Sequence, residues 1–467
     1  MRRGRVRYSN RRKKSKFPLI LSIILLLAIG GGAFYAYTSP MFERDKPKII
    51  ALRTLSANSK TPIKFKLEDN VGLKSCKVVL SSNGKEYPIY NQKFLISSKS
   101  KVVKVALPKE ITDSKNSKWD ILISATDSSL WNFMMGNSSI FRGKLIIDNT
   151  PPKVDIVASS QNIRKGGSGL VIYRVEDEHL KSSYVDIGNG IKFRPVKYKK
   201  DGVYATLIAW PFNMDEFNPK VVAIDNANNK SVNSLQIYKL DKVYKTSKIK
   251  ASDKFIDGKI SELAQNDSDY SNISDRLKKL KAVNELMRKK NEDLIHKLSK
   301  GVTPFQDRWS IKPFKPLKGS KRVSDFGVKR YYYYKTPDNI VSTSYHVGYD
   351  FASIKHDNIY SSNKGVVVFA SRNGIYGNMP LIDHGFGLYT LYGHCSSVLV
   401  KKGDRVKENQ VIAKTGVTGL ALGDHLHFGV LVQGIEVLPL EWMKARWIDD
   451  HINLIFRKAD ENLGIIR

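Results

Sequence analysis

The sequence is poor in cysteine, in acidic residues and in long apolar runs. Cys76 and Cys395 are the only cysteines among 467 residues, so a disulfide framework is excluded and stability has to come from packed cores. Asp and Glu number 44 against 78 Lys and Arg, a balance that favours nucleic acid, anionic lipid or an anionic polymer as a partner. The only long uncharged apolar run covers residues 17–38.

The N-terminal region has the composition of a membrane anchor. Residues 1–16 contain nine basic residues and no acidic one, and the 22 residues from Phe17 to Thr38 carry no charge. About 20 apolar residues cross a bilayer and basic residues stay in the cytoplasm, so we expect a single-pass helix in the inner (cytoplasmic) membrane. A cleaved signal peptide is the alternative, but the run is longer than a typical signal core and lacks an A-x-A site.

This orientation predicts that everything after about residue 40 lies in the periplasm or the cell-wall space. We therefore expect no nucleic-acid partner. An extracellular anionic polymer remains the macromolecule that suits the basic composition.

Residues 45–245 form a succession of short strand-like runs that contains an internal repeat. The segment IKFKLEDNVGLKSCKVVL at 63–80 returns as VIYRVEDEHLKSSYVDI at 171–187, a spacing near one hundred residues. This spacing matches the size of an immunoglobulin-like (Ig-like) sandwich. We therefore predict two such β modules, which serve as spacers or bind a partner.

Residues 250–300 have a helical pattern instead. Asn284 and Asn291 interrupt the apolar stripe, which favours a helix docked on a neighbouring domain over a long coiled coil. Strand-like runs punctuated by glycine then return over 310–445. The apolar positions of the helical stripe are Leu277, Leu280, Met287, Leu294 and Leu298.

Seven of the nine histidines fall between residues 346 and 451. His346 and Asp350 occur in YHVGYDF, His394 in LYGHCS, and His425 and His427 in GDHLHFG. Even spacing in an extended strand places His346 and Asp350 on one side, and it likewise places the two later histidines on one face. A lone His-x-His pair is usually solvated, so the prediction of a functional site depends on the combination of the three segments.

Imidazole and carboxylate are suitable ligands for zinc. A catalytic zinc site takes three protein ligands and leaves one position to water. His346, Asp350 and one of the two later histidines meet that requirement. Two histidines then remain for proton transfer and for stabilising charge on an attacked carbonyl.

The ordered set H-x-x-x-D, Y-G-H and H-L-H resembles the LytM/lysostaphin-type zinc metallopeptidases over roughly residues 320–440. The resemblance implies a β-rich, lipoyl-barrel-like peptidase domain with Zn²⁺ as its one cofactor. It also implies that His346, Asp350 and His427 are the zinc ligands and that His394 and His425 are the catalytic pair. His384 and His451 match no motif position, so we interpret them as structural, and we expect Cys395 in the core.

The resemblance implies hydrolysis of peptide cross-links or stem peptides of peptidoglycan, with cell-wall assembly proteins as candidate partners. A regulatory or scaffold protein whose peptidase-like domain activates a separate hydrolase is the alternative. A lipoyl-type carrier would leave the five histidine and aspartate positions unexplained. The expected fold is mainly β, and its expected parts are a basic tail (1–16), a transmembrane helix (17–38), two Ig-like modules (45–148 and 149–245), a helical segment (250–300), the peptidase domain (310–445) and a C-terminal tail (446–467).

Overall fold

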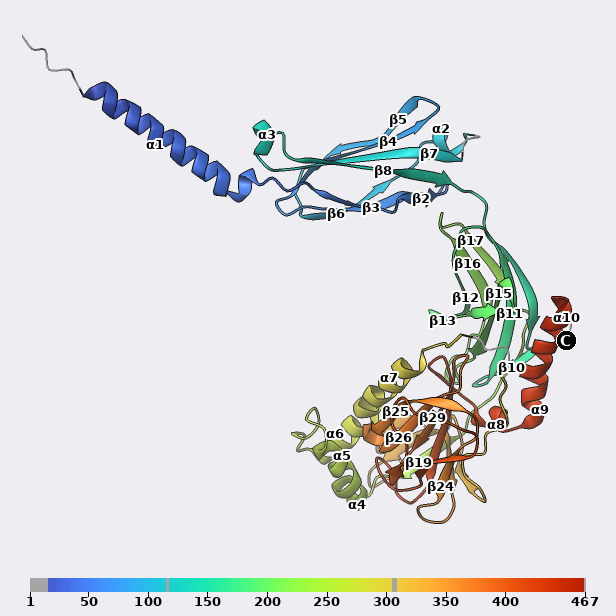
Figure 1. Cartoon of the computed structure of the whole chain (residues 1–467). Helices are drawn as coiled ribbons and strands as arrows, with labels where there is room; N and C mark the ends of the chain where they lie inside the picture. The colour runs from blue at the N-terminus through green and yellow to red at the C-terminus, as the bar shows by residue number, and fades with distance from the viewer. Residues whose placement is uncertain (1–15, 115–116, 305–308, 466–467) are drawn as a thin grey trace, which may run out of the picture. The chain divides into compact units, whose positions relative to one another are not determined.

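The protein is described by a computed structural model over residues 16–114, 117–304 and 309–465, so the predicted basic tail lies outside the described residues except for Lys16. With 41% strand and 21% helix, the chain is mainly β, and the predicted fold class is confirmed. Contacts divide the chain into one compact unit of Met1–Thr150 with Asn226–Asn229 and a second of Pro151–Asp225 with Lys230–Arg467. Figure 1 shows both units and labels many of their elements.

The first unit begins with helix α1 (Phe17–Thr38), whose apolar side chains are exposed along its length. The window Leu19–Thr38 has a mean hydropathy of 2.3 and none of it is buried. A helix of this length and composition suits a bilayer core, and a signal sequence near an N-terminus has the same profile.

The β part of the first unit consists of two sheets that face each other across an apolar core. In strand β3 the buried residues Ile63, Phe65 and Leu67 alternate with exposed lysines, so one face of the strand is apolar and packs in this core. One sheet has the order β1-β3-β6 and the other β2-β8-β7-β4-β5, consistent with a sandwich module. The elements are β1 (Lys48–Ile50), β2 (Thr54–Ala57), β3 (Ile63–Glu68), β4 (Leu73–Ser82), β5 (Lys85–Lys93), β6 (Ser100–Val105), α2 (Lys109–Thr112), β7 (Lys118–Asp127), α3 (Trp131–Met134) and β8 (Ser138–Ile147).

The second unit opens with a further pair of four-stranded sheets, ordered β14-β15-β11-β9 and β13-β12-β16-β17. A short parallel pair, β10 with β18, lies beside them. The strands are β9 (Lys153–Ser159), β10 (Asn162–Arg164), β11 (Ser168–Glu176), β12 (Leu180–Gly188), β13 (Ile191–Phe193), β14 (Val196–Tyr198), β15 (Lys200–Ala209), β16 (Lys220–Asp225), β17 (Lys230–Ser234) and β18 (Tyr238–Leu240). Their buried side chains belong to the same core cluster as those of the C-terminal strands.

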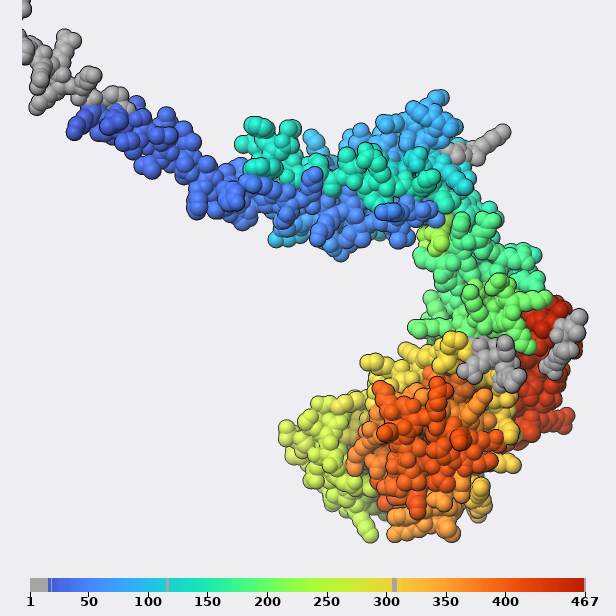
Figure 2. Space-filling view, in the orientation of Figure 1, coloured from blue at the N-terminus to red at the C-terminus, as the bar shows by residue number. Residues whose placement is uncertain are grey.

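The segment predicted only as a C-terminal tail is helical and docks on this β region (Figure 2). Helices α8 (Pro439–Trp442), α9 (Ala445–Ile448) and α10 (Leu454–Asn462) follow one another. Ile452, Ile455 and Ala459 recur at helical spacing and are buried, and the Tyr198 hydroxyl donates to Asp460 at 2.7 Å. The finer boundaries predicted within residues 149–467 stay predictions, because both sides of each belong to one compact unit.

The helical segment forms two stretches that pack on the strands next to it. The first runs through α4 (Asp253–Phe255), a π-helical turn (Ile256–Ile260) and α5 (Ser261–Gln265). The second runs through α6 (Arg276–Lys281), a π-helical turn (Ala282–Met287) and α7 (Arg288–Ser299). Leu280 and Met287 of the predicted stripe share a buried cluster with Leu381, Leu391 and Leu431 of the C-terminal sheet.

We expect Leu280→Ala to destabilise the whole second unit. Leu280 is fully buried in the cluster that joins the helical segment to the sheet, and truncating such a leucine typically costs about 2–5 kcal/mol. Leu286→Ala is the matched control, because Leu286 is 60% exposed in the same stretch. Denaturant unfolding measures both variants, and equal midpoints would show that the segment is not part of this core.

The C-terminal strands form an eight-stranded sheet, ordered β20-β23-β31-β27-β26-β25-β29 with β32 paired to β31, and two three-stranded sheets, β19-β21-β22 and β24-β30-β28. Strand β19, which precedes the helical segment, pairs in parallel with β21. The bounds are β19 (Thr246–Lys250), β20 (Lys321–Ser324), β21 (Lys329–Tyr333), β22 (Ile340–Tyr345), β23 (Tyr349–Ala352), β24 (Asn358–Ser361), β25 (Gly365–Arg372), β26 (Asn378–Asp383), β27 (Leu388–Gly393), β28 (Ser397–Val398), β29 (Arg405–Val406), β30 (Gln410–Lys414), β31 (Leu426–Val432) and β32 (Ile435–Val437).

Candidate active site

Three neighbouring strands of the eight-stranded sheet bring the motif residues together. Strand β31 lies between β23 and β27, and its His427 is directly opposite Asp350 on one side and Gly393 on the other. His394 follows Gly393 at the end of β27, and His425 precedes β31. The register of the three strands therefore assembles residues that are up to 81 positions apart in the chain.

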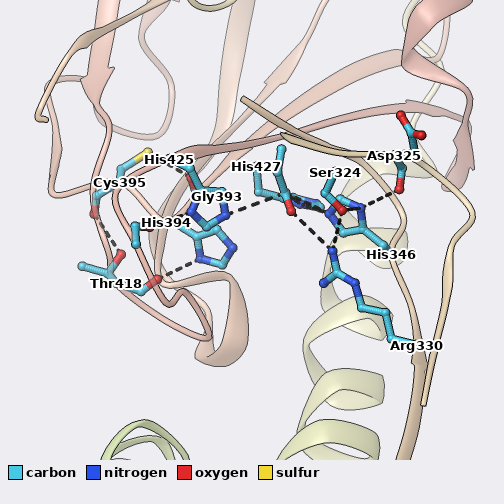
Figure 3. A network of polar contacts seen from close by, with 12 residues as sticks. Ser324, Asp325, Arg330, His346, Gly393, His394, Cys395, Thr418, His425 and His427 are labelled. Atoms are coloured by element: carbon cyan, nitrogen blue, oxygen red, sulfur yellow. Dashed lines mark hydrogen bonds and ion pairs between the residues drawn. The ribbon is translucent and has the colours of Figure 1, made fainter. Parts of the chain in front are cut away.

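His346, Asp350 and His427 point their donor atoms at one another. Figure 3 shows His346 and His427 side by side. His346 Nε2 lies 2.8 Å from Asp350 Oδ1 and 3.0 Å from His427 Nδ1. Asp350 Oδ1 and His427 Nδ1 are 2.9 Å apart. All three residues are less than 9% exposed. His346 Nδ1 donates to the Asp325 carbonyl at 2.7 Å, so the neutral ring presents the lone pair of Nε2 to the group.

His346 and Asp350 do not lie on one extended strand as the sequence pattern suggested. β22 ends at Tyr345 and β23 begins at Tyr349, and the chain bends at Gly348 between them. Their side chains meet through this bend. A Cβ at position 348 would lie 2.6 Å from Cε1 of His427 and 2.7 Å from the Phe428 carbonyl, so glycine is required for the strand to approach so closely.

We therefore expect Gly348→Ala to displace the His427 ring and to lower metal affinity. Changes that disturb the orientation of a ligand typically cost about 10- to 100-fold in affinity. Gly423→Ala is the control, because a Cβ there meets nothing within 4 Å. Zinc titration of the purified chains measures the effect, and equal affinity of the two variants would contradict the steric requirement.

His394 and His425 form a second pair beside this group, as Figure 3 shows. Their ring centres are 4.8 Å apart. His394 Nδ1 donates to the Thr418 carbonyl at 2.8 Å, and His425 Nδ1 donates to the Gly423 carbonyl at 2.7 Å. Since a carbonyl only accepts, both rings carry their proton on Nδ1 when neutral and leave Nε2 as an acceptor.

The backbone holds His394 in an unusual conformation. Its φ is +65°, in the left-handed region that is costly for a side chain with a Cβ. The amide N–H of His394 donates to the Tyr376 carbonyl at 2.8 Å, which maintains this conformation. The strained turn directs the His394 ring toward His425 and not along the strand.

Burial sets the charge of the site. It lowers the pKa of His427 to about 4 despite the opposing effect of Asp350, and it holds the pKa of His394 well below its ordinary value, with His425 adding to the effect. Burial alone would raise the pKa of Asp350, but contact with His346 and His427 keeps it well below the usual range. Near neutral pH Asp350 thus offers a carboxylate and His427 a neutral imidazole.

The site lies in a cleft of about 630 Å³ that all five residues line. Two further residues that line the cleft, Arg330 and Tyr376, were not identified by the sequence motifs. Arg330 donates to Ser324 at 2.8 Å and to Asp350 Oδ2 at 3.4 Å, and the buried Tyr376 ring packs against His427 at 5.5 Å. Arg330 follows the DFG segment on β21, and no spacing rule connects it with the histidines.

The remaining residues singled out in the sequence lie outside the group. His384 is buried, with its ring nitrogens at 2.9 Å from the Lys364 carbonyl and 2.7 Å from the Thr390 hydroxyl. His451 Nδ1 contacts the Trp447 carbonyl at 3.1 Å in the C-terminal helical region. Cys395 is fully buried in the core. All three positions agree with the structural roles expected for them.

The donor set suits zinc. Two imidazole nitrogens and one carboxylate oxygen converge within 4.8 Å, and His346 is oriented by a backbone carbonyl, as is typical of metal-binding histidines. Three such atoms, with lone pairs directed at one another in a buried place, repel each other unless a cation or a shared proton lies among them. The roles of the individual residues remain predictions.

Comparison with known proteins agrees with the geometry. Residues 344–439 match the model for peptidase family M23. Peptidoglycan DD-endopeptidase ShyA of Vibrio cholerae is 41% identical over 100 residues, which are 21% of this chain and 23% of that protein. Stage II sporulation protein Q of Bacillus subtilis is 36% identical over 91 residues, 19% of this chain and 32% of that protein. The matches thus span a third or less of these relatives.

A solved structure shows a similar partial likeness. The catalytic domain of the antimicrobial peptidase lysostaphin from Staphylococcus simulans is 26% identical, with a TM-score of 0.23, over 27% of this chain and 93% of that one. The part of this chain that is matched in sequence contains all five candidate site residues.

Proposed function

We propose that this chain, whose C-terminal part contains a domain of peptidase family M23, is a membrane-anchored, zinc-dependent endopeptidase that hydrolyses peptide cross-links or stem peptides of peptidoglycan. The observation that carries the proposal is the convergence of His346, Asp350 and His427 in one cleft with two histidines whose Nδ1–H groups are held by backbone carbonyls. The names of relatives such as the DD-endopeptidase ShyA support the substrate class.

In this proposal His346 Nε2, Asp350 Oδ1 and His427 Nδ1 hold the zinc. Zinc supplies Lewis acidity for water activation and for polarising the scissile carbonyl. Arg330, which donates to the Ser324 hydroxyl, also donates to Oδ2 of Asp350 and keeps its carboxylate in place. The Asp325 carbonyl fixes the ring of His346.

His394 and His425 move the protons. Each neutral ring is held through Nδ1–H, so its Nε2 accepts a proton from the attacking water and, once protonated, donates it to the leaving amine. His425 Nε2 is 3.8 Å from Asp350 Oδ1, so His425 lies next to the ligand group.

The cleft wall on the side of the helical segment is basic. Lys250, which ends β19, and Arg288, which begins α7, line the cleft together with Arg330. Arg288 is held in place because it donates to the Asn284 side chain at 3.0 Å. Such a wall suits a peptide that carries carboxylates, as the stem peptides of peptidoglycan do.

The test is digestion of purified cross-linked cell-wall fragments by the full chain in detergent, followed by mass analysis of the products. We expect new amino and carboxyl termini within the peptide part, loss of cleavage with a zinc chelator, and recovery when zinc is added back. Products cut only in the glycan, or none with zinc-loaded folded protein, would contradict the proposal.

A regulatory function is the second candidate, and the match to stage II sporulation protein Q favours it, because that relative is named for a process and not for an activity. In this case the zinc group would be structural and the cleft would bind a partner hydrolase. The digestion assay with and without added hydrolase separates the two functions.

A further inference from the structure

One end of the first β module exposes apolar side chains on two loops, residues 94–99 and 128–137, which we call the membrane-proximal loops. Leu95 is fully exposed and Ile96 is 83% exposed on one loop. Phe133 is 94% exposed and Met134 69% exposed on the other. Fully exposed large apolar residues that gather at one place, unlike scattered ones, indicate a contact surface.

The two loops lie at the same end of the module. The Ser97 and Ser128 hydroxyls are 3.1 Å apart, and the Ser128 amide donates to the Gly72 carbonyl at 2.7 Å, next to the start of β4. Asp127 closes the base of the second loop by accepting from the amides of Ser129 and Asn137. The apolar tips are thus carried on a firmly hydrogen-bonded base.

The end of α1 joins these loops. The Leu130 amide donates to the Met41 carbonyl at 2.7 Å, three residues after α1 ends. The Arg44 guanidinium lies over two aromatic rings, at 5.0 Å from the centre of Tyr37 in α1 and 4.3 Å from that of Trp131 in the loop. Figure 1 shows α3, which belongs to the second loop, at the end of the module where α1 arrives.

The backbone of the second loop is strained in a way that exposes its apolar residues. Asn132, Phe133 and Met134 have φ of +56°, +57° and +66°, the left-handed region that L-residues with side chains rarely adopt. Among the described residues of the unit, Phe133 remains 94% exposed, and Lys74 donates to the Met134 carbonyl at 3.0 Å. Strain of this kind persists where the exposed conformation is used.

We propose that the membrane-proximal loops enter the interface of the lipid bilayer and seat the first β module on the membrane surface. The inference rests on the anchoring of α1 proposed above, because Thr38 at the end of the apolar helix marks the bilayer boundary and the second loop contacts Met41, three residues beyond it. Apolar and aromatic side chains with basic neighbours enter such an interface by about 5–10 Å.

The experiment places an environment-sensitive fluorophore on single introduced cysteines of the full chain in phosphatidylcholine/phosphatidylglycerol vesicles that contain a lipid-borne quencher. Cys76 and Cys395 are buried, and burial raises the pKa of both thiols to about 12, so labelling stays at the introduced site. Met134→Cys and Ile96→Cys report the loops. Lys85→Cys is the control, because β4 carries it about 30 Å away to the other end of the module.

We expect blue-shifted emission and severalfold stronger quenching at positions 134 and 96 than at position 85. Phe133→Asp should reduce quenching of the position 96 probe without unfolding the module, since the Phe133 side chain is 94% exposed. Equal quenching at the three positions would overturn the proposal. A position 134 probe that stays in water in vesicles but is shielded in intact cells would also overturn it, in favour of a protein partner.

A probe at Leu27→Cys, in the middle of α1, reports the anchor separately. Loss of quenching at position 27 with quenching kept at position 134 would contradict the anchor and support the loop contact. The reverse pattern would support the anchor and overturn the loop contact.

Discussion

His394→Ala and His425→Ala are each expected to lower peptide hydrolysis by about 10²- to 10⁴-fold while the zinc content stays that of the unchanged chain. Neither ring belongs to the group of three donor atoms, and both present Nε2 to the cleft from a fixed Nδ1–H. Removing one ring therefore removes a proton acceptor and leaves the ligands in place. The loss should appear in kcat more than in KM, because a proton transferred in the transition state contributes little to substrate binding.

His179→Ala is the control for this pair, since His179 is an exposed histidine of the second β region outside the cleft. Hydrolysis rates, zinc per chain and unfolding midpoints are measured for all three variants. Full activity of both His394→Ala and His425→Ala would reject their proposed roles. If both also restored growth of a strain lacking the protein, the regulatory function would be favoured.

Asp350→Ala should remove both zinc and hydrolysis. Asp350 is the only carboxylate of the donor group, and its loss leaves two imidazoles facing a cation with no negative charge beside it. It also leaves Arg330 without its carboxylate partner beside the site, which further disfavours a metal ion. Asp350→Asn keeps the size of the side chain and removes the charge, so it should also bind zinc more weakly than the unchanged chain.

Asp424→Ala is the matched control for Asp350, because Asp424 lines the same cleft and lies outside the donor group. Elemental analysis of the purified chains gives zinc per protein. Full retention of zinc by Asp350→Ala would rule out the proposed ligand set. Loss of zinc from both variants would point to a general disturbance of the cleft.

The sequence alone was enough for the mainly β fold, the apolar N-terminal helix and the segment that contains the site. Each of these depends on local patterns, such as the alternation of Ile63, Phe65 and Leu67 or the uncharged run of α1, which the folded chain does not override. The motifs also identified the five residues His346, Asp350, His394, His425 and His427, which the structure brings into one cleft. Their identification depended on resemblance, because spacing alone left open which later histidine binds metal.

Other features depend on contacts between residues that are distant in the chain. The bend at Gly348 arises because β23 approaches the His427 ring too closely for a Cβ, and the turn at His394 arises because Tyr376 and Thr418 accept its two N–H groups. Arg330 on β21 contacts Asp350 on β23 because the folded chain brings these two strands close together, with β20 paired to β23. Such contacts have no periodicity in the sequence.

In the C-terminal segment and the membrane-proximal loops, too, the sequence pattern predicts the local structure, and the tertiary contacts decide where it packs. The spacing of Ile452, Ile455 and Ala459 is helical, but only their packing on β9 and β11 in the folded chain decides that this helix docks there. Phe133 and Leu95 are ordinary apolar residues in the sequence, and their exposure next to the end of α1 follows from the two-sheet fold of the first module. Sequence patterns determined which segments form strands and helices, whereas strand register and long-range packing decided which side chains meet, because those contacts join residues far apart in the chain.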